Sequence, residues 1–222
     1  GEFLETSAKI TAVAVDKTGT LTEGKPHLTD VVTVNPAYDR TEVLRWAAAA
    51  EAGSEHPLAV PIVDAARNEG VAPDGIPEHV TPVPGKGIAA QVGDQRILIG
   101  NQPLLDEFQV AHNSEAESAA NTLAAQGKTP MIVALDDTVL GVIGVADQLR
   151  PDAAEMIARL HATGVEKVVM LTGDTRLVAE AIGRQVGIDE IHASMLPEDK
   201  LEAVTQMQRD GYVVAMVGDG VN

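Results

Sequence analysis

A buried strand that ends abruptly in an acid constrains this chain more than any other feature. Residues 10–15 are almost all apolar and mostly β-branched or small, which is typical of a strand buried on both faces of a parallel sheet. Asp16 follows directly, and in open α/β sheets ligands bind beyond the carboxyl ends of the strands. Gly19 permits a tight turn, and the threonines within Thr18–Thr22 supply hydroxyls and main-chain donors around an anion. We therefore expect chemistry at Asp16.

A carboxylate at this position can act as a nucleophile towards a phosphoryl group and form an aspartyl phosphate. An isolated Asp-Lys-Thr would more simply be a buried strand that ends in a turn. The whole run Asp16–Thr22 is more specific, because it resembles the phosphorylation motif of P-type ATPases, the ion pumps that pass through an aspartyl phosphate. The resemblance implies that Asp16 is the phosphorylated residue and that Lys17 and Thr18 belong to its catalytic loop.

The composition limits the kinds of partner. The chain has 222 residues, enough for one large or two modest domains, and a formal net charge of -17. This charge argues against binding to nucleic acid or to an anionic membrane surface, so an anion such as ATP needs local positive potential. There is no cysteine, which is compatible with a reducing cytosol, and the six histidines are scattered without ligand spacing. No apolar run approaches the ~20 residues that span a bilayer.

The pattern of predicted elements changes twice along the chain. The first helix would have Thr41 as its cap, and the second would have Pro57 in its first turn. The periodicity predicts helices over 41–52, 57–70, 114–125, 151–163, 177–186 and 197–209, and strands over 10–15, 28–34, 87–92, 95–99, 131–135, 139–145, 168–171 and 212–217.

These elements predict an α/β fold with an inserted domain. Residues 1–30 and 148–222 would form a doubly wound, parallel-sheet domain of the kind found in haloacid dehalogenase-type enzymes, which the resemblance makes the phosphorylation domain. Residues 31–147 would form an inserted α+β domain with an antiparallel sheet, which the resemblance makes the nucleotide-binding domain.

Two more strands end in groups suited to phosphate chemistry, and the parallel sheet would gather these ends at one edge. Thr172 and Gly173 offer a hydroxyl and main-chain N–H groups beside a helix N-terminus, and Asp16 and Asp219 could share one Mg2+. Asp219 could equally be part of a Gly-Asp-Gly turn. Lys200 lies in the first turn of a helix, where the helix dipole disfavours a cation, so it is either functional or a solvated surface lysine.

Leu171–Asp174, Leu196–Lys200 and Met216–Asn222 resemble further P-type ATPase motifs and occur in the family's order. The resemblance implies that Thr172 and Lys200 hold the transferred phosphoryl group. It also implies a Mg2+ site and further motif residues, and it places the family's hinge between its two cytoplasmic domains at Asp147–Pro151. The implied Mg2+ ligands are Asp16, the Thr18 carbonyl and Asp219, and the other implied catalytic residues are Gly173, Asp174 and Asn222.

Ser54–Ala59 narrows the class, because it resembles the motif of heavy-metal-transporting P-type ATPases in which a Glu and a His contact the adenine. The resemblance assigns these contacts to Glu55 and His56, although a lone histidine at a helix start is more often a cap or a core residue. Glycines let the backbone approach a flat base or phosphates. The positions that match the nucleotide pocket of this class are Gly85, Gly87, Gly100 and Asn101.

The resemblance covers essentially the whole chain and implies the cytosolic ATP-binding and autophosphorylating portion of a heavy-metal cation-exporting P-type ATPase. The implied cofactors are ATP and Mg2+. The implied partners are the transported ion, reached through membrane helices of the parent chain, and the parent's actuator domain, at the cytoplasmic face of the cell membrane. Copper, zinc, cadmium and cobalt stay open as cargo, with a lean towards a divalent ion from residues 168–174. The sequence stops one residue before the family's next acid, so we expect nucleotide binding with little turnover.

Two other functions fit part of the pattern. A stand-alone phosphatase of the haloacid dehalogenase type shares the fold and the nucleophile, but such enzymes usually carry a second acid two residues later, where this chain has Thr18. A non-catalytic nucleotide-binding module would have no reason to keep Asp16, Thr172, Lys200 and Asp219 together.

Overall fold

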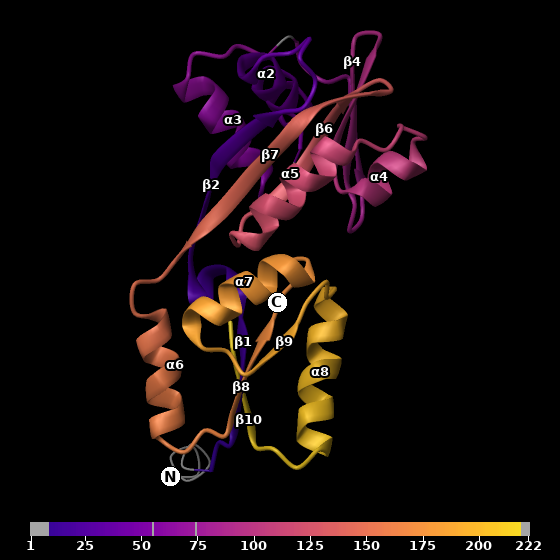
Figure 1. Ribbon diagram of the computed structural model, residues 1–222. Helices are drawn as coiled ribbons and strands as arrows, with labels where there is room; N and C mark the ends of the chain where they lie inside the picture. The colour runs from indigo at the N-terminus through magenta and orange to yellow at the C-terminus, as the bar shows by residue number, and fades with distance from the viewer. Residues whose placement is uncertain (1–8, 55, 74, 219–222) are drawn as a thin grey trace. The chain divides into compact units, whose positions relative to one another are not determined.

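The computed structural model describes residues 9–54, 56–73 and 75–218. Contacts between residues divide the chain into two compact units, each described by itself below. The first unit holds the chain up to Lys25 and from Asp147 onward, and the second holds most of the residues between them. Two long strands, β2 (Thr22–Thr33) and β7 (Thr138–Leu149), carry the chain from the first unit to the second and back (Figure 1).

The first unit is built on a parallel sheet with the strand order β10-β1-β8-β9. Its central strand, β1 (Ala12–Asp16), pairs in parallel with β10 (Val214–Val217) on one side and with β8 (Lys167–Leu171) on the other. The short strand β9 (Glu190–His192) extends the sheet beyond β8. All five residues of β1 are buried, as the apolar run before Asp16 predicts.

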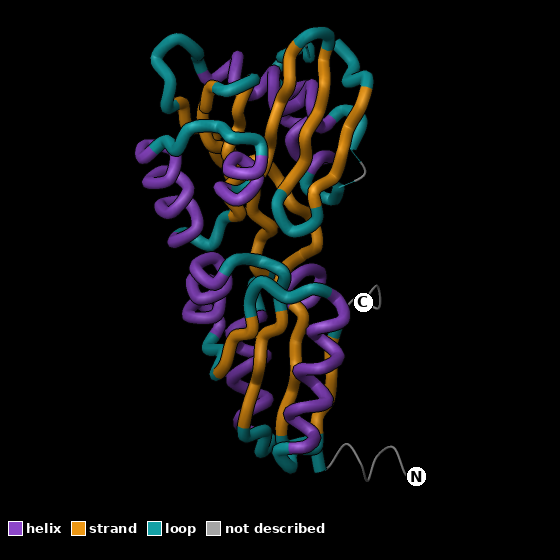
Figure 2. Tube along the Cα trace, turned by 90° about the vertical axis from the view of Figure 1, so that its right-hand side faces the viewer, coloured by secondary structure: helices purple, strands orange, loops and turns teal. Residues whose placement is uncertain are grey.

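Helices cover both faces of this sheet (Figures 1 and 2). Val13 and Val15 share a core with α6 (Ala153–Ala162) and α7 (Arg176–Val186), while Ala12 and Ala14 share another with α8 (Pro197–Arg209). Successive side chains of a strand point to opposite faces, so this division follows from the sequence of β1. The doubly wound fold that the sequence predicts is confirmed.

The second unit contains a six-stranded sheet with the order β2-β7-β6-β5-β4-β3, in which the pairs from β3 to β7 are antiparallel. Ile97 and Ile99 share a core with α2 (Arg40–Glu51) and α3 (Ala59–Asn68), and Leu98 shares one with α4 (Gln102–Glu107) and α5 (Ser114–Ala125). The remaining strands are β3 (His79–Val83), β4 (Gly87–Val92), β5 (Gln95–Gly100) and β6 (Thr129–Leu135). This is the predicted α+β architecture.

The structure differs from the predicted elements in a few places. The cap of α2 is Asp39 and not Thr41, because the Asp39 and Glu42 side chains each accept the other residue's main-chain N–H in a capping box. Pro57 precedes α3, which begins at Ala59. The pattern also missed β3, β9 and α4. Strand β3 contains Pro82, which is tolerated because β3 lies at the sheet edge, and α4 has only six residues. Within the described residues, no helix is both long and apolar enough to cross a membrane.

Candidate active site

Asp16 ends the central strand of the first unit and lies in register with Leu171, the last residue of β8. The residue after Leu171 is Thr172, so the two predicted site residues meet at the carboxyl edge of the sheet. Asp16 is 5% exposed and Thr172 is 3% exposed. Burying polar groups is unfavourable unless they find partners, and both do.

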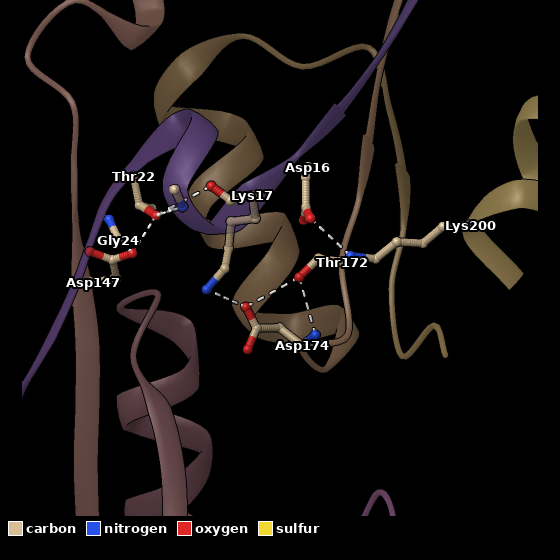
Figure 3. A network of polar contacts seen from close by, with 9 residues as sticks. Asp16, Lys17, Thr22, Gly24, Asp147, Thr172, Asp174 and Lys200 are labelled. Atoms are coloured by element: carbon tan, nitrogen blue, oxygen red, sulfur yellow. Dashed lines mark hydrogen bonds and ion pairs between the residues drawn. The ribbon is translucent and has the colours of Figure 1, made fainter. Parts of the chain in front are cut away.

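Lys200 supplies the partner of Asp16. Its Nζ lies 3.0 Å from Asp16 Oδ2, and the lysine is only 8% exposed (Figure 3). The segment before α8 is tied to the same edge, since the Met195 main-chain N–H donates to the Thr172 carbonyl at 3.1 Å. Lys200 is therefore not a solvated surface lysine, and its place in the first turn of α8 brings an ammonium to a buried carboxylate.

A second lysine and a second carboxylate lie beside this pair. Lys17 Nζ is 2.5 Å from Asp174 Oδ2, and both side chains are largely buried. The Thr172 hydroxyl accepts the Asp174 main-chain N–H at 3.1 Å and is 3.3 Å from Asp174 Oδ2 (Figure 3). Although the whole chain is strongly acidic, this edge brings two ammonium groups beside Asp16, and each of them is balanced by one carboxylate.

The loop after Asp16 turns sharply at Gly19, whose φ of 74° lies in the left-handed region. Thr18 is exposed and keeps an extended conformation. The prediction that the Thr22 hydroxyl is one of the groups around an anion is wrong. Thr22 is 1% exposed, and its hydroxyl bonds to Asp147, as Figure 3 shows. The predicted site residue Gly173 is exposed and follows Thr172 directly.

Three predicted site residues, Glu55, Asp219 and Asn222, lie outside the described residues. Of the predicted Mg2+ ligands, the structure therefore describes Asp16 and Thr18. A buried carboxylate and a main-chain carbonyl are the hard oxygen donors that Mg2+ prefers, so the part of the set that is described fits this ion. Within the same described ranges, no group of three or more acidic, histidine or cysteine side chains could hold a metal.

In the second unit the structure brings together the four residues that the family resemblance assigned to the nucleotide pocket, Gly85, Gly87, Gly100 and Asn101. Gly87 and Gly100 face each other across β4 and β5. The Asn101 side chain donates to the Gly85 carbonyl at 2.9 Å. A Cβ on Gly87 would lie 2.1 Å from the Ile99 carbonyl oxygen, so the close approach of the two backbones requires glycine.

His56 lies in the connection between α2 and α3. Its Nδ1 accepts the Leu58 main-chain N–H at 3.2 Å, so the histidine does form the local, cap-like bond that the simpler interpretation suggested. Burial of part of the ring lowers the pKa of His56, which favours the neutral imidazole. With Nδ1 occupied as an acceptor, Nε2 carries the proton and can donate to a ligand.

Glu51, at the end of α2, is a candidate that the sequence analysis missed. The residue is 4% exposed, and its Oε2 is buried without a hydrogen-bond partner among the described residues. Burial raises the pKa of Glu51 to about 7, although a hydrogen bond from Ser54 opposes this. The Ser54 hydroxyl in turn accepts the His56 main-chain N–H at 3.2 Å. The available signal was a glutamate directly after four alanines and shortly before Ser54.

Comparison with known proteins identifies the family. A model of the haloacid dehalogenase-like hydrolases matches residues 10–222. The chain belongs to this family. Within it, the similar proteins are heavy-metal P-type ATPases, so the predicted resemblance is confirmed, as is the predicted fold class. A zinc-exporting P-type ATPase of Mycobacterium marinum is 38% identical over 224 residues, covering all of this chain and 30% of that protein.

Other similar proteins are also heavy-metal P-type ATPases. A probable copper-exporting P-type ATPase V of Mycobacterium tuberculosis is 44% identical, covering all of this chain and 28% of that protein. Among solved structures, a zinc-transporting PIB-type ATPase in the E2.Pi state is 41% identical with a TM-score of 0.65, over 98% of this chain and 34% of that one. The catalytic domain of the CPx-ATPase CopB-B is 25% identical with a TM-score of 0.70, and the match covers 100% of this chain and 77% of that one. The chain thus spans about 30% of the length of these curated relatives.

Proposed function

We propose that this chain is the ATP-binding and phosphorylated portion of a heavy-metal-exporting P-type ATPase. The observation that carries the proposal is the buried Asp16 carboxylate at the end of the central strand, held by Lys200 at 3.0 Å. The full protein would then lie in the cell membrane, with this portion on the cytoplasmic face. Its partners would be ATP, the transported ion in the membrane helices and the actuator domain of the parent chain.

The reaction would begin with attack by an Asp16 carboxylate oxygen on the γ-phosphorus of ATP, while the bond from phosphorus to the ADP oxygen breaks. A carboxylate and a triphosphate repel each other, and Lys200 lies where it reduces this repulsion. Lys17 is fixed by Asp174, and the same Asp174 contacts the Thr172 hydroxyl, so a second cation and a hydroxyl donor are held beside the nucleophile. Asp16 and the Thr18 carbonyl would hold Mg2+, with Asp219 as the third predicted ligand. When bound, this ion neutralises phosphate charge.

The second unit would bind the nucleotide. Gly87 pairs with Gly100, and the Asn101 side chain bonds to Gly85, so these four residues lie close together, which supports their predicted role. The Glu51 carboxyl group adds an acceptor that is buried and incompletely bonded, and such a group is suited to the amino group of adenine. His56 can offer Nε2–H as a donor, and Glu55 keeps its predicted role at the base.

The transported ion stays open. The similar proteins are named for zinc, manganese, copper and silver export, so their names do not favour one charge. Our lean towards a divalent ion therefore stays a prediction. The phosphatase alternative is less supported, because the relatives are pumps and Thr18 occupies the position where such a phosphatase usually has its second acid.

Phosphate incorporation tests the proposal. The chain is mixed with Mg2+ and ATP labelled in the γ-phosphate, quenched in acid and exposed to hydroxylamine, which cleaves acyl phosphates. We expect a hydroxylamine-labile phosphoprotein in the wild type and none in Asp16→Asn, with ATP binding retained in both. Turnover of simple phosphomonoesters at the rates of ordinary phosphatases, without a persistent phosphoprotein, would instead favour the phosphatase.

A further inference from the structure

The end of β7 and the residue after it hold the loop between Lys17 and Lys25 through side-chain contacts. We propose that Asp147 and Arg150 clamp this loop and thereby position it for phosphoryl transfer to Asp16. Both act through the loop and are positioning residues, and this role rests on the function proposed above. All of the contacts concerned lie within the first unit.

Asp147 gathers three donors on one carboxylate. Its Oδ2 accepts from the Thr22 hydroxyl and from the Gly24 main-chain N–H at 3.0 Å, and its Oδ1 accepts the Lys25 N–H at 2.9 Å. An ionised carboxylate can only accept hydrogen bonds, so all three donors are satisfied together. Asp147 therefore fixes the end of the loop at two main-chain positions and one side chain.

Thr22 passes this constraint on to the turn next to the nucleophile. Its hydroxyl oxygen accepts the Gly19 main-chain N–H at 3.2 Å and lies 3.2 Å from the Lys17 carbonyl oxygen. A hydroxyl has one proton, and the carboxylate is the strongest acceptor within reach. Asp147 thus directs the proton of Thr22 towards itself and leaves a lone pair for Gly19.

Arg150 holds the same turn from the other side of the peptide. Its Nη2 donates to the Gly19 carbonyl oxygen at 3.1 Å, and its main-chain N–H donates to the Leu21 carbonyl oxygen at 2.9 Å. Both polar groups of Gly19 are therefore bonded, the N–H through Thr22 and the carbonyl through Arg150. The turn that follows Thr18 is therefore held by three residues, Thr22, Asp147 and Arg150, which do not include the nucleophile.

The test compares Asp147→Asn with the wild type of this chain. Asparagine has one oxygen for three donors, and its NH2 group would face an N–H, so the clamp is weakened with little change of shape. Asp152→Asn is the control, because Asp152 is exposed and makes no capping bond to α6, while the change in charge is the same. A second pair, Thr22→Val and Thr22→Ser, removes or keeps the relaying hydroxyl.

Two readouts are measured. The first is hydrogen exchange of the Gly19 amide by NMR, which we expect to accelerate at least about tenfold in Asp147→Asn and Thr22→Val, as for the loss of one hydrogen bond to a charged group. The second is the rate of phosphate incorporation from ATP and from acetyl phosphate, a donor that needs no nucleotide site. We expect this rate to fall about tenfold with both donors, at unchanged ATP affinity. Thr22→Ser and Asp152→Asn should behave as the wild type.

Unchanged Gly19 exchange in Asp147→Asn and Thr22→Val would overturn the clamp. The clamp would also be overturned if the variants lost phosphorylation by ATP but kept phosphorylation by acetyl phosphate. That result would mean that Asp147 and Thr22 only help to bring the nucleotide to Asp16. If the wild type takes phosphate from neither donor, the proposed function fails, whereas the exchange comparison still decides whether the clamp exists. If Asp147→Asn does not fold, the two Thr22 variants decide in its place.

Discussion

Replacing Glu51 with glutamine should stabilise the second unit, and the gain should depend on pH. Glu51 is 4% exposed at the end of α2, with a buried Oε2 that has no hydrogen-bond partner among the residues described. Burial disfavours the charged form, which is why the pKa of this carboxyl group rises to about 7. Glutamine has nearly the same shape and no charge, so Glu51→Gln removes the penalty without opening a cavity.

The size and sign follow from the two pKa values. The pKa is 4.5 for the exposed group and about 7 in the fold. Below pH 4.5 both states are protonated and the wild type pays no charge penalty. Between the two values the folded state binds more protons than the unfolded state, so stability falls as pH rises. At about 1.4 kcal/mol for each unit of pKa difference, Glu51 costs the fold about 3 kcal/mol once the pH exceeds 7.

The assay is urea unfolding followed by tryptophan fluorescence at a series of pH values from 4.5 to 8. The chain has a single tryptophan, Trp46, and this residue is part of α2, so the signal reports on the unit that contains Glu51. The free energy of unfolding of Glu51→Gln should match that of the wild type at pH 4.5 and exceed it by about 3 kcal/mol at pH 8. Other groups cancel in this difference.

A difference between the two proteins that does not change with pH would refute the reasoning, and so would a variant less stable than the wild type at pH 8. Nucleotide binding gives the complementary test. If the Glu51 carboxyl group accepts a hydrogen bond from the base, the stabilised variant should bind ATP about tenfold or more weakly. A gain in stability together with a loss of affinity is expected of a residue whose incomplete bonding serves a ligand.

Two further substitutions test the geometry of each unit. Lys200→Met should lower the free energy of unfolding by about 3 to 5 kcal/mol, because it leaves the Asp16 carboxylate buried without its lysine. The double variant Lys200→Met/Asp16→Asn should recover most of this loss in urea unfolding, and additive losses would contradict the pairing. Gly87→Ala should destabilise the second unit more than Gly85→Ala, because the new Cβ would lie 2.1 Å from a main-chain oxygen at Gly87 and in open space at Gly85. In thermal melts followed by Trp46 fluorescence, Gly85→Ala should show only the cost of its positive φ, about 1 to 2 kcal/mol, and equal losses would argue against the close approach of β4 and β5.

Local signals were enough to predict the elements that carry the site. A strand of apolar residues that stops at an acid predicts both its own burial and the position of that acid at the sheet edge, and β1 has both properties. The glycine and proline positions likewise predict the bounds of α5 and α8 to the residue. The sequence pattern did not predict the short elements, because six residues in α4 and three in β9 are too few to show a hydrophobic period.

Long-range contacts explain what the sequence could not predict at the site. Lys200 lies 184 residues from Asp16 along the chain. Its place in a helical first turn left it open between a functional and a surface lysine, and only the family resemblance assigned it to the phosphoryl group. For Glu51 the local signal was a glutamate directly after a run of alanines, and its burial is seen only in the fold. For Thr22 the prediction failed for the same reason, because its partner Asp147 lies 125 residues away.

The position of Thr22 shows that the residues of the motif Asp16–Thr22 have different roles. Two carboxylates and two ammonium groups lie around the reacting position, with Lys200 paired to Asp16 and Lys17 paired to Asp174. The threonine at the end of the same motif is buried and bonded to a carboxylate on another strand, so it serves the shape of the loop and not the anion. A loop whose turn is already held by hydrogen bonds has little need to reorganise when a phosphoryl group arrives, and such preorganisation is where enzymes gain most of their electrostatic stabilisation. The residue that reacts, Asp16, and the residue that shapes the loop, Thr22, are therefore close in sequence but depend on different partners. A substitution of Asp16 should affect its pairing with Lys200, whereas a substitution of Thr22 should affect its bond to Asp147.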